Sequence, residues 1–282
     1  MPKDYHMRKY SLAYLTIPGT DPVTQIRIAR KTGYDFVSLR TIPMHLPGEP
    51  EFVLENDPDL FLSIKTALRE EGIALPDIEL ARIRPDIDVK DFEPAFEKAA
   101  ELGATGVLGS VWTRDRVFYT EKVAEVAEMA ARYGLIYHVE FLPWAGIRNL
   151  QEDITLVEKM RALGHENVRI MLDTLHAGRA GVTAEEIRRT DPSMFGFIHL
   201  CDGPAGPDGD PVLDNIKDDL MLYTAREARF YPGEGAMGVK ALVDALPEND
   251  ISIELPNLAQ MTALGPEGHA RRCLSKAKEL FG

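Results

Sequence analysis

Cysteine and positive charge are both scarce in this sequence. Its 282 residues include two cysteines, Cys201 and Cys273, which excludes a disulfide framework and a cysteine-rich zinc site. The formal net charge of −13 means that the chain lacks the cationic field that attracts nucleic-acid phosphates and anionic membranes. We therefore expect the protein to bind neither nucleic acid nor a membrane.

Long hydrophobic runs are absent as well. A membrane-spanning helix needs about 18 or more consecutive apolar residues, and no window of the sequence approaches that length. The opening residues, MPKDYHMRKY, contain no apolar signal-peptide core, so we expect a cytoplasmic protein. No G-x-G-x-x-G motif follows the first strand predicted below, which disfavours an open dinucleotide-binding sheet.

What the sequence does contain is a regular alternation of short β-type runs and helical patterns. We predict strands at 11–17, 36–40, 75–83, 105–112, 135–142, 168–175, 196–202 and 251–256. We predict helices near 22–32, 60–71, 93–102, 117–133, 151–163, 183–189, 238–245 and 266–280. Eight successive strand–helix units favour a closed parallel barrel, so the predicted fold class is α/β, a single (β/α)8 TIM barrel.

The same pattern predicts one TIM-barrel domain over residues 1–282, because no linker or low-complexity tract divides the chain. Two longer interruptions stand out. A polar, proline-rich excursion at 41–59 is a candidate lid, since loops of this length between barrel elements are often functional. A second long loop is predicted at 203–237.

Four side chains that can bind metals stand near the ends of the last four predicted strands. They are Glu140 in HVEF, Asp173 in MLDT, His199 in FIHLCD and Glu254 in SIELP. The active sites of TIM barrels lie at the carboxyl ends of the strands, so we expect these four side chains to converge. Taken singly, each has the ordinary alternative role of a hydrogen-bonding group at a strand end.

The charge of this predicted cluster points to a cation. Three carboxylates that share a dry pocket repel one another strongly, and a bound cation removes that repulsion. One imidazole with three carboxylates suits a divalent ion that keeps open positions for substrate oxygens. We therefore predict one divalent metal ion held by these four side chains, with Mn²⁺ favoured and Mg²⁺, Co²⁺ or Zn²⁺ as alternatives.

Two further strand-end residues are candidates for substrate binding. Arg40 ends the second predicted strand, where it is either a group that binds a substrate carboxylate or hydroxyl, or an ordinary surface arginine. Glu79 lies in the third predicted strand. It is either a substrate-binding carboxylate or the ion-pair partner of Arg82 or Arg40.

The sequence from HVEFLPW (138–144) to SIELPN (252–257) resembles the xylose isomerase-like barrels known as sugar phosphate isomerases/epimerases, and the resemblance extends over nearly the whole chain. This family includes tagatose/psicose 3-epimerases, inosose dehydratases, hydroxypyruvate isomerases and dehydroshikimate dehydratases. In it, Glu, Asp, His and Glu at the ends of the last four strands hold the metal, which matches the four residues above. The resemblance also implies that Glu140 and Glu254 are the catalytic pair that exchanges a substrate proton.

Three more residues take roles from the same resemblance. His176 follows the aspartate by three positions, as in the family, and would polarise a substrate carbonyl or hold a hydroxyl. Asp202 completes an H-x-x-D pattern in HLCD, near the substrate or behind the metal ligands. Arg229 in REARFYPGEG matches an arginine that precedes a G-x-G turn. One departure is Ala205, since the 3-epimerases carry an arginine six residues after the metal-binding histidine.

The residues and the resemblance together predict a metal-dependent isomerase or epimerase that acts on a keto sugar or related polyol through an enediolate. A lyase or dehydratase is the alternative, because the same enolisation can expel a β-leaving group from a keto-inositol, a dehydroshikimate-like acid or a 3-keto glycoside. An AP-endonuclease-like phosphoesterase would need more histidines at strand ends, and a non-catalytic barrel would not need the four-residue set.

The expected partner is a small sugar-like or cyclic polyol substrate. It is expected to be uncharged, or to carry one carboxylate bound by Arg40 or Arg229, because no glycine-rich anion cradle follows the last two predicted strands. Dimers and tetramers occur in the family, so the resemblance also allows a homo-oligomer.

Overall fold

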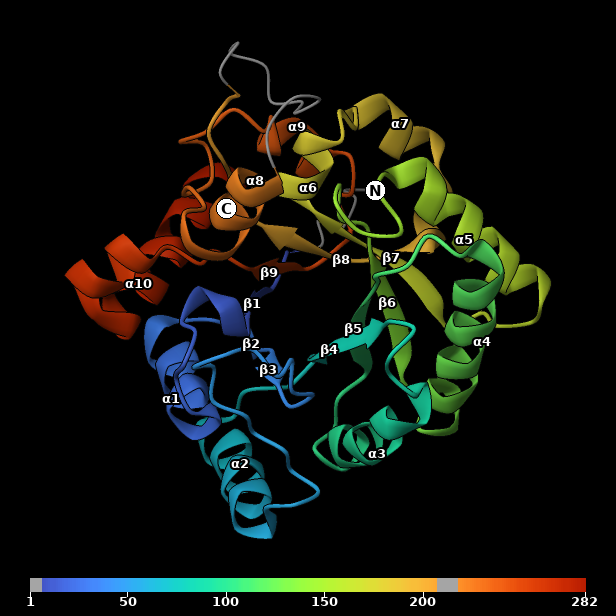
Figure 1. Cartoon of the computed structure of the whole chain (residues 1–282). Coiled ribbons are helices and arrows are strands. Elements are labelled where there is room, and N and C mark those ends of the chain that lie inside the picture. Colours follow the sequence, from blue (N-terminus) through green and yellow to red (C-terminus); the bar gives the residue numbers. More distant parts are fainter. Residues whose placement is uncertain (1–6, 207–217) are drawn as a thin grey trace, which may run out of the picture.

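The computed structural model describes residues 7–206 and 218–282, and in these ranges nine parallel strands form one sheet (Figure 1). The strand order is β2-β1-β9-β8-β7-β6-β5-β4-β3, and β2 and β3 are the two halves of a strand interrupted at Ser38. The sheet therefore curls into a nearly closed barrel with helices around it. The predicted TIM-barrel fold is confirmed.

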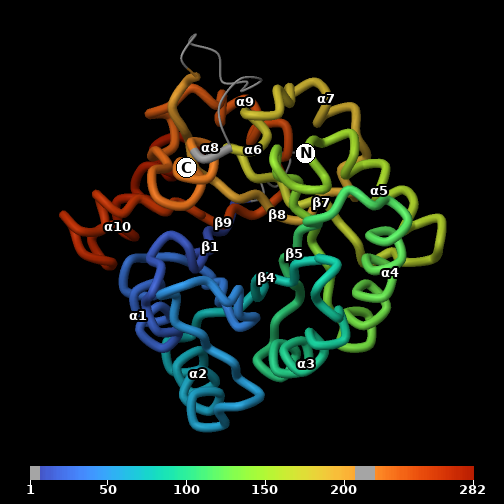
Figure 2. The backbone as a smooth tube through the Cα atoms, in the orientation of Figure 1, coloured from blue at the N-terminus to red at the C-terminus, as the bar shows by residue number. Residues whose placement is uncertain are grey.

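The strands are short, and the first and last of them meet in the wall of the barrel. Their bounds are β1 Tyr10–Leu12, β2 Phe36–Val37, β3 Leu39–Arg40, β4 Asp77–Ile83, β5 Gly106–Val111, β6 Ile136–Glu140, β7 Val168–Asp173, β8 Phe195–Leu200 and β9 Ile251–Ile253. Strand β1 pairs with both β2 and β9, so the first and last strands of the chain lie side by side (Figure 2).

The helices pack around the outside of the sheet. Their bounds are α1 Pro22–Thr32, α2 Pro58–Glu71, α3 Glu93–Glu101, α4 Arg116–Arg132, α5 Leu150–Ala162, α6 Thr174–Arg179, α7 Ala184–Arg189, α8 Asp218–Glu227, α9 Val239–Asp244 and α10 Leu258–Phe281. Local signals set their ends: α1 begins after Asp21, whose carboxylate accepts from the backbone N–H of Thr24, and ends at Gly33, whose φ of 95° favours glycine. No helix within the described ranges is long and apolar enough to cross a membrane.

The predicted strand at 11–17 is wrong beyond β1, where the chain turns into the short 3-10 helix Tyr14–Thr16. The Thr16 hydroxyl donates to the Ile253 carbonyl (2.6 Å) and accepts from the Leu255 N–H (3.0 Å). The Thr16 side chain thus takes over the connection to β9 that a longer strand would have made.

Two helices lie where the sequence pattern predicts none. Helix α6 begins directly after β7, and α8 falls inside the predicted loop 203–237, of which residues 207–217 lie outside the described residues. Helix α10 begins before its predicted start at 266, because Gly265 (φ 70°, ψ 165°) and Pro266 only kink the helix there.

The packing of the barrel wall leaves no free space for a side chain at Gly109. A Cβ at Gly109 in β5 would lie 2.3 Å from Tyr137 Oη and 2.4 Å from the Ala81 carbonyl oxygen. We expect Gly109→Ala to lower the free energy of unfolding by about 1–3 kcal/mol in chemical denaturation, because β4 or β6 must move to admit the methyl group. Gly268→Ala in α10 is the control, since its Cβ meets Leu264 Cβ at 3.1 Å and alanine is the better helix former. Unchanged stability of Gly109→Ala would contradict this packing.

Candidate metal centre

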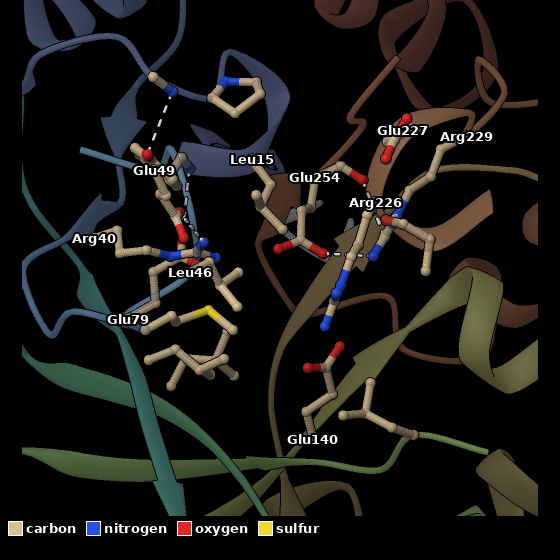
Figure 3. A pocket seen from close by; sticks show the side chains of 18 of the residues that line it. Leu15, Arg40, Leu46, Glu49, Glu79, Glu140, Arg226, Glu227, Arg229 and Glu254 are labelled. Atoms are coloured by element: carbon tan, nitrogen blue, oxygen red, sulfur yellow. Dashed lines mark hydrogen bonds and ion pairs between the residues drawn. The ribbon is translucent and has the colours of Figure 1, made fainter. Parts of the chain in front are cut away.

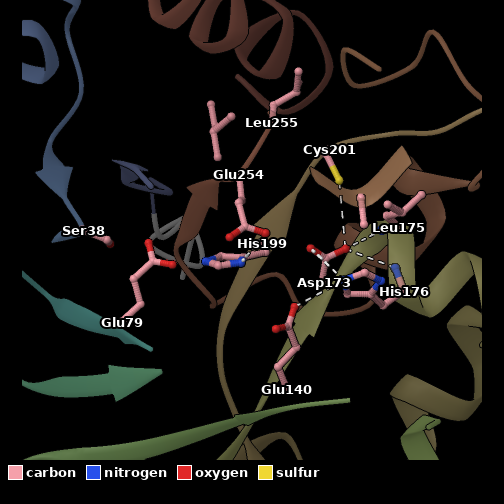
Figure 4. A network of polar contacts seen from close by, with 12 residues as sticks. Ser38, Glu79, Glu140, Asp173, Leu175, His176, His199, Cys201, Glu254 and Leu255 are labelled. Carbon is pink, nitrogen blue, oxygen red and sulfur yellow. Dashed lines mark hydrogen bonds and ion pairs between the residues drawn. The ribbon is translucent and has the colours of Figure 1, made fainter. Parts of the chain in front are cut away.

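Four buried side chains converge at the carboxyl end of the barrel (Figure 4). One ligand atom from each lies within 4.8 Å of the others; the four residues are Glu140, Asp173, His199 and Glu254. The strand register explains the convergence, since Asp173 of β7 is level with His199 of β8, and His199 is level with Ser252 of β9, two residues before Glu254. The convergence predicted from the strand ends is therefore present in the barrel.

Asp173 is held by backbone and side-chain donors together. It is the last residue of β7 and the N-cap of α6, and its Oδ1 accepts from the backbone N–H groups of Leu175 (2.7 Å) and His176 (3.1 Å). Its Oδ2 accepts from Arg229 Nη1 at 2.5 Å. Burial alone would raise the pKa of Asp173, but the nearby Arg229 charge lowers it, so this carboxylate stays ionised.

Arg229 links two members of the cluster. Besides its bond to Asp173, its Nη2 lies 2.8 Å from Glu254 Oε2. The guanidinium is fixed from behind, because Nε donates to the Ala225 carbonyl in α8 and Nη1 lies 3.1 Å from Cys201 Sγ. Burial raises the pKa of the Cys201 thiol, which therefore remains a neutral neighbour rather than a nucleophile.

The other members of the cluster have shifted pKa values and unused ligand atoms. Burial and the neighbouring carboxylates of Glu254 and Asp173 raise the pKa of Glu140 well above its usual range. Burial lowers the pKa of His199, but the carboxylates of Glu254 and Glu140 outweigh that and raise it to about 9. No hydrogen bond within the described part of the chain involves Glu140 Oε1 or either ring nitrogen of His199.

These observations fit a divalent cation. A metal–oxygen distance of about 2.1 Å separates opposite ligands by about 4.2 Å, so small side-chain adjustments would bring the four ligand atoms onto one ion. The cation would also relieve the repulsion among three buried carboxylates. The buried four-residue cluster therefore suggests one divalent metal ion, whose identity the donor set leaves open.

A cavity of about 390 Å³ opens beside the cluster (Figure 3). His176 lines it, with Nε2 3.6 Å from Glu140 Oε1 and its ring 5.0 Å from that of Trp144 in an edge-on contact. Burial lowers the pKa of His176 to about 4 despite the nearby Asp173, so its imidazole is neutral at pH 7. It can therefore donate or accept a hydrogen bond at a substrate oxygen.

Arg40 and Glu79 also line the cavity, but they are already paired with each other. Arg40 Nη2 lies 2.8 Å from Glu79 Oε2, and Arg40 Nη1 lies 2.6 Å from Glu49 Oε1. Interpreting Arg40 as a surface arginine is wrong, because its side chain is buried and stacks on the Tyr14 ring. The partner of Glu79 is Arg40 and not Arg82, which donates instead to a backbone carbonyl.

Asp202 is buried and is not among the described residues that line the cavity, so of its two predicted places, near the substrate or behind the metal ligands, the second fits its surroundings better. Its carboxylate accepts from the backbone N–H groups of Gly203, Gly233, Gly235 and Met237, at 2.9 to 3.1 Å. The H-x-x-D pattern thus marks a loop anchor: it ties the turn after α8 to the end of β8. The turn that Asp202 holds lies just downstream of Arg229, so this anchor stabilises the segment that carries Arg229.

Four further cavity residues escaped the sequence analysis. Tyr14 and Glu49 lie in segments interpreted as strand and lid, and Arg226 and Glu227 belong to α8, inside a stretch interpreted as loop. The apolar wall includes Met44, Leu46, Leu80, Leu108, Trp112, Leu142, Trp144 and Leu258. An amphipathic pattern in DDLMLYTARE was the signal that could have revealed α8.

The cluster predicts a measurable metal affinity that depends on Asp173. We expect wild-type protein to bind one Mn²⁺ per chain in isothermal titration calorimetry, and Asp173→Asn to weaken that binding by at least about 100-fold, since the amide oxygen is a neutral and weaker ligand. Metal affinity that survives Asp173→Asn unchanged would remove this residue from the ligand set.

Asp202→Asn is the matched control for this experiment and a prediction of its own. It changes a buried carboxylate that the ligand cluster does not include. We expect metal affinity within about twofold of wild type, but a loss of about 1–3 kcal/mol of unfolding free energy in thermal denaturation, because backbone donors lose a charged acceptor. Loss of metal binding without loss of stability would place Asp202 in the metal site instead.

Known proteins with similar sequences include two inosose isomerases. That of Halalkalibacterium halodurans is 22% identical over 268 residues, covering 88% of this chain and 88% of its own length. That of Bacillus velezensis is 23% identical over 269 residues, covering 88% of this chain and 89% of its own.

Solved structures share the fold over the whole chain. The IolI protein with a bound zinc atom superimposes with a TM-score of 0.78 at 18% identity, covering 97% of this chain and 98% of its own. The D-psicose 3-epimerase with D-tagatose from Clostridium cellulolyticum H10 gives a TM-score of 0.67 at 17% identity, covering 97% of this chain and 99% of its own. The sequence profile described as xylose isomerase-like TIM barrel matches residues 26–274, and the chain belongs to this family.

Proposed function

We propose that this protein is a divalent-metal-dependent isomerase or epimerase that acts on a keto sugar or a related cyclic polyol. The observation that carries the proposal is the cluster of four buried ligand atoms within 4.8 Å of one another, which opens onto a cavity of about 390 Å³. When bound, a divalent cation would polarise a ketone and its neighbouring hydroxyl and so acidify the intervening C–H bond. Mn²⁺ is the proposed ion.

The chain's own residues supply the proton transfer. Glu140 and Glu254 belong both to the ligand cluster and to the cavity wall, and they come from β6 and from the residue after β9. One carboxylate removes the carbon-bound proton and the other returns a proton to the enediolate. His176, neutral and in contact range of Glu140, holds the carbonyl or hydroxyl oxygen of the substrate.

The relatives support a polyol ketone as the substrate. The similar sequences are named inosose isomerases, and inososes are cyclic polyol ketones. One structure with the same fold is a D-psicose 3-epimerase with D-tagatose, a ketohexose. In a polyol ketone of either kind, isomerisation through an enediolate would begin by removing a proton next to the ketone, which is the step that the two glutamates are proposed to perform.

The loop at 41–59 is proposed to act as a cover over the site, within a single domain of 282 residues. Met44, Leu46 and Glu49 from this loop line the cavity, and Glu49 is bound to Arg40 of β3. The loop therefore contributes part of the surface that a bound substrate would contact, while its polar outer residues remain in solvent.

Glu254→Gln is expected to abolish turnover while the fold is retained, because glutamine cannot accept the substrate proton. The measurement is loss of a C–H signal in the NMR spectrum when Mn²⁺-loaded protein is incubated in D₂O with ketohexoses, keto-inositols, dehydroshikimate and 3-keto glucosides. The exposed Glu248→Gln is the control and should exchange at the wild-type rate. Substantial exchange by Glu254→Gln would remove Glu254 from the reaction, and the product identified would separate epimerisation from elimination.

A further inference from the structure

Both buried arginines of the cavity wall have their charge matched by two carboxylates each. Arg229 contacts Asp173 and Glu254 at 2.5 and 2.8 Å. Arg40 contacts Glu49 and Glu79 at 2.6 and 2.8 Å. Since a guanidinium carries one positive charge and each carboxylate one negative charge, each group of one arginine and two carboxylates has a formal charge of −1.

The Arg40–Glu49–Glu79 cluster stands across the cavity from the metal ligands (Figure 3). The side chains of Arg40 and Glu79 are almost fully buried, and that of Glu49 is 15% exposed. The Tyr14 ring lies 4.6 Å from the Arg40 guanidinium, and the backbone N–H of Tyr14 donates to Glu79. This rigid cluster has a net charge of −1 and holds the loop that supplies Glu49.

The cavity as a whole is poor in available positive charge. Among the described residues that line it, five glutamates stand against three arginines, and a divalent ion bound at the metal ligands would only balance this difference, so no surplus of positive charge results. Arg226 is exposed and forms no ion pair with a described residue, which makes it the alternative partner for an anionic substrate group.

The proposed function, on which this step rests, leaves open the charge of the substrate. We infer that the cavity takes uncharged polyhydroxy ketones, and that the Arg40–Glu49–Glu79 cluster binds their hydroxyl groups and rejects a carboxylate or phosphate in their place. A hydroxyl group donates to one carboxylate and accepts from the guanidinium, so it suits this cluster. A buried anion would instead be repelled by the two carboxylates, and the guanidinium that could attract it is already paired with them.

The cluster also offers hydrogen-bonding capacity that the described residues leave unused. Glu49 Oε2 accepts no hydrogen bond from them, and Arg40 Nε donates none, although both atoms are buried. Leaving such atoms unsatisfied is costly, so a substrate that supplies hydroxyl groups to this side of the cavity gains affinity. Glu49 is the residue that sets the charge balance, because without it Arg40 and Glu79 would form a neutral pair.

The first test compares matched sugars. Saturation-transfer NMR on Mg²⁺-loaded protein would measure binding of D-fructose against D-fructose 6-phosphate, and of D-tagatose against D-tagaturonate. We expect each uncharged sugar to bind at least about tenfold more tightly than its charged partner. Equal or tighter binding of the charged sugars would overturn the inference. If the protein prefers the charged sugars and Arg226→Gln abolishes that preference, the inference is also overturned, and Arg226 is the residue that binds the anionic group.

The second test removes one charge from the cluster. Glu49→Gln should shift the ratio of affinities toward the charged sugars by about tenfold, whereas Glu49→Asp should retain the wild-type preference. Glu51→Gln is the matched control, because Glu51 lies on the same loop and pairs with the exposed His45 outside the cavity. Thermal denaturation checks that each variant is folded. Identical ratios in Glu49→Gln and Glu51→Gln would overturn the role of the cluster.

Proton exchange separates this inference from the proposed function. A preference for uncharged sugars with no C–H exchange in D₂O for any sugar that binds would overturn the proposed reaction and leave the charge selectivity standing. Exchange that is faster with tagaturonate or fructose 6-phosphate than with the uncharged sugars would overturn the selectivity and leave the proposed reaction standing.

Discussion

The crowding of three carboxylates within one buried cluster is the constraint on which the rest of this end of the barrel depends. Ligand atoms of Glu140, Asp173 and Glu254 lie within 4.8 Å of one another and of a His199 ring nitrogen. At low dielectric such an arrangement is strongly unfavourable unless cations balance it. Arg229 and His199 provide part of the balance, and a bound cation would supply the rest.

Several structural features serve to hold this charge in place. The parallel strands end at the same level, so side chains at the ends of β6 to β9 lie close together. The N-terminus of α6 then turns two backbone N–H groups onto Asp173, which orients one carboxylate oxygen and leaves the other for Arg229. Asp202 fixes the turn that follows Arg229, through four backbone donors. The candidate metal cluster, the buried arginine and the loop anchor therefore form one connected unit.

The opposite wall of the cavity repeats the motif of one arginine between two carboxylates. Here Arg40 lies between Glu79 of β4 and Glu49 of the loop 41–59, and the pairing ties that loop to the barrel. Apolar side chains such as Leu80, Leu108 and Trp112 line the same cavity as the two polar regions. A ring with polar edges and apolar faces, as in a cyclic polyol, matches such an alternation of surfaces.

Local patterns in the sequence were enough to predict the barrel and the convergence of Glu140, Asp173, His199 and Glu254. Strand and helix periodicity repeats within each unit, and parallel topology then forces the strand ends to meet. Long-range pairing was decided only by the tertiary structure. The partners of Arg40 lie 9 and 39 residues away, and Arg229 reaches Asp173 across 56 residues. The loop-anchoring role of Asp202 and the place of α8 at the cavity were likewise beyond sequence reasoning, because periodicity describes which face of an element is buried but not which distant group a buried charge will meet.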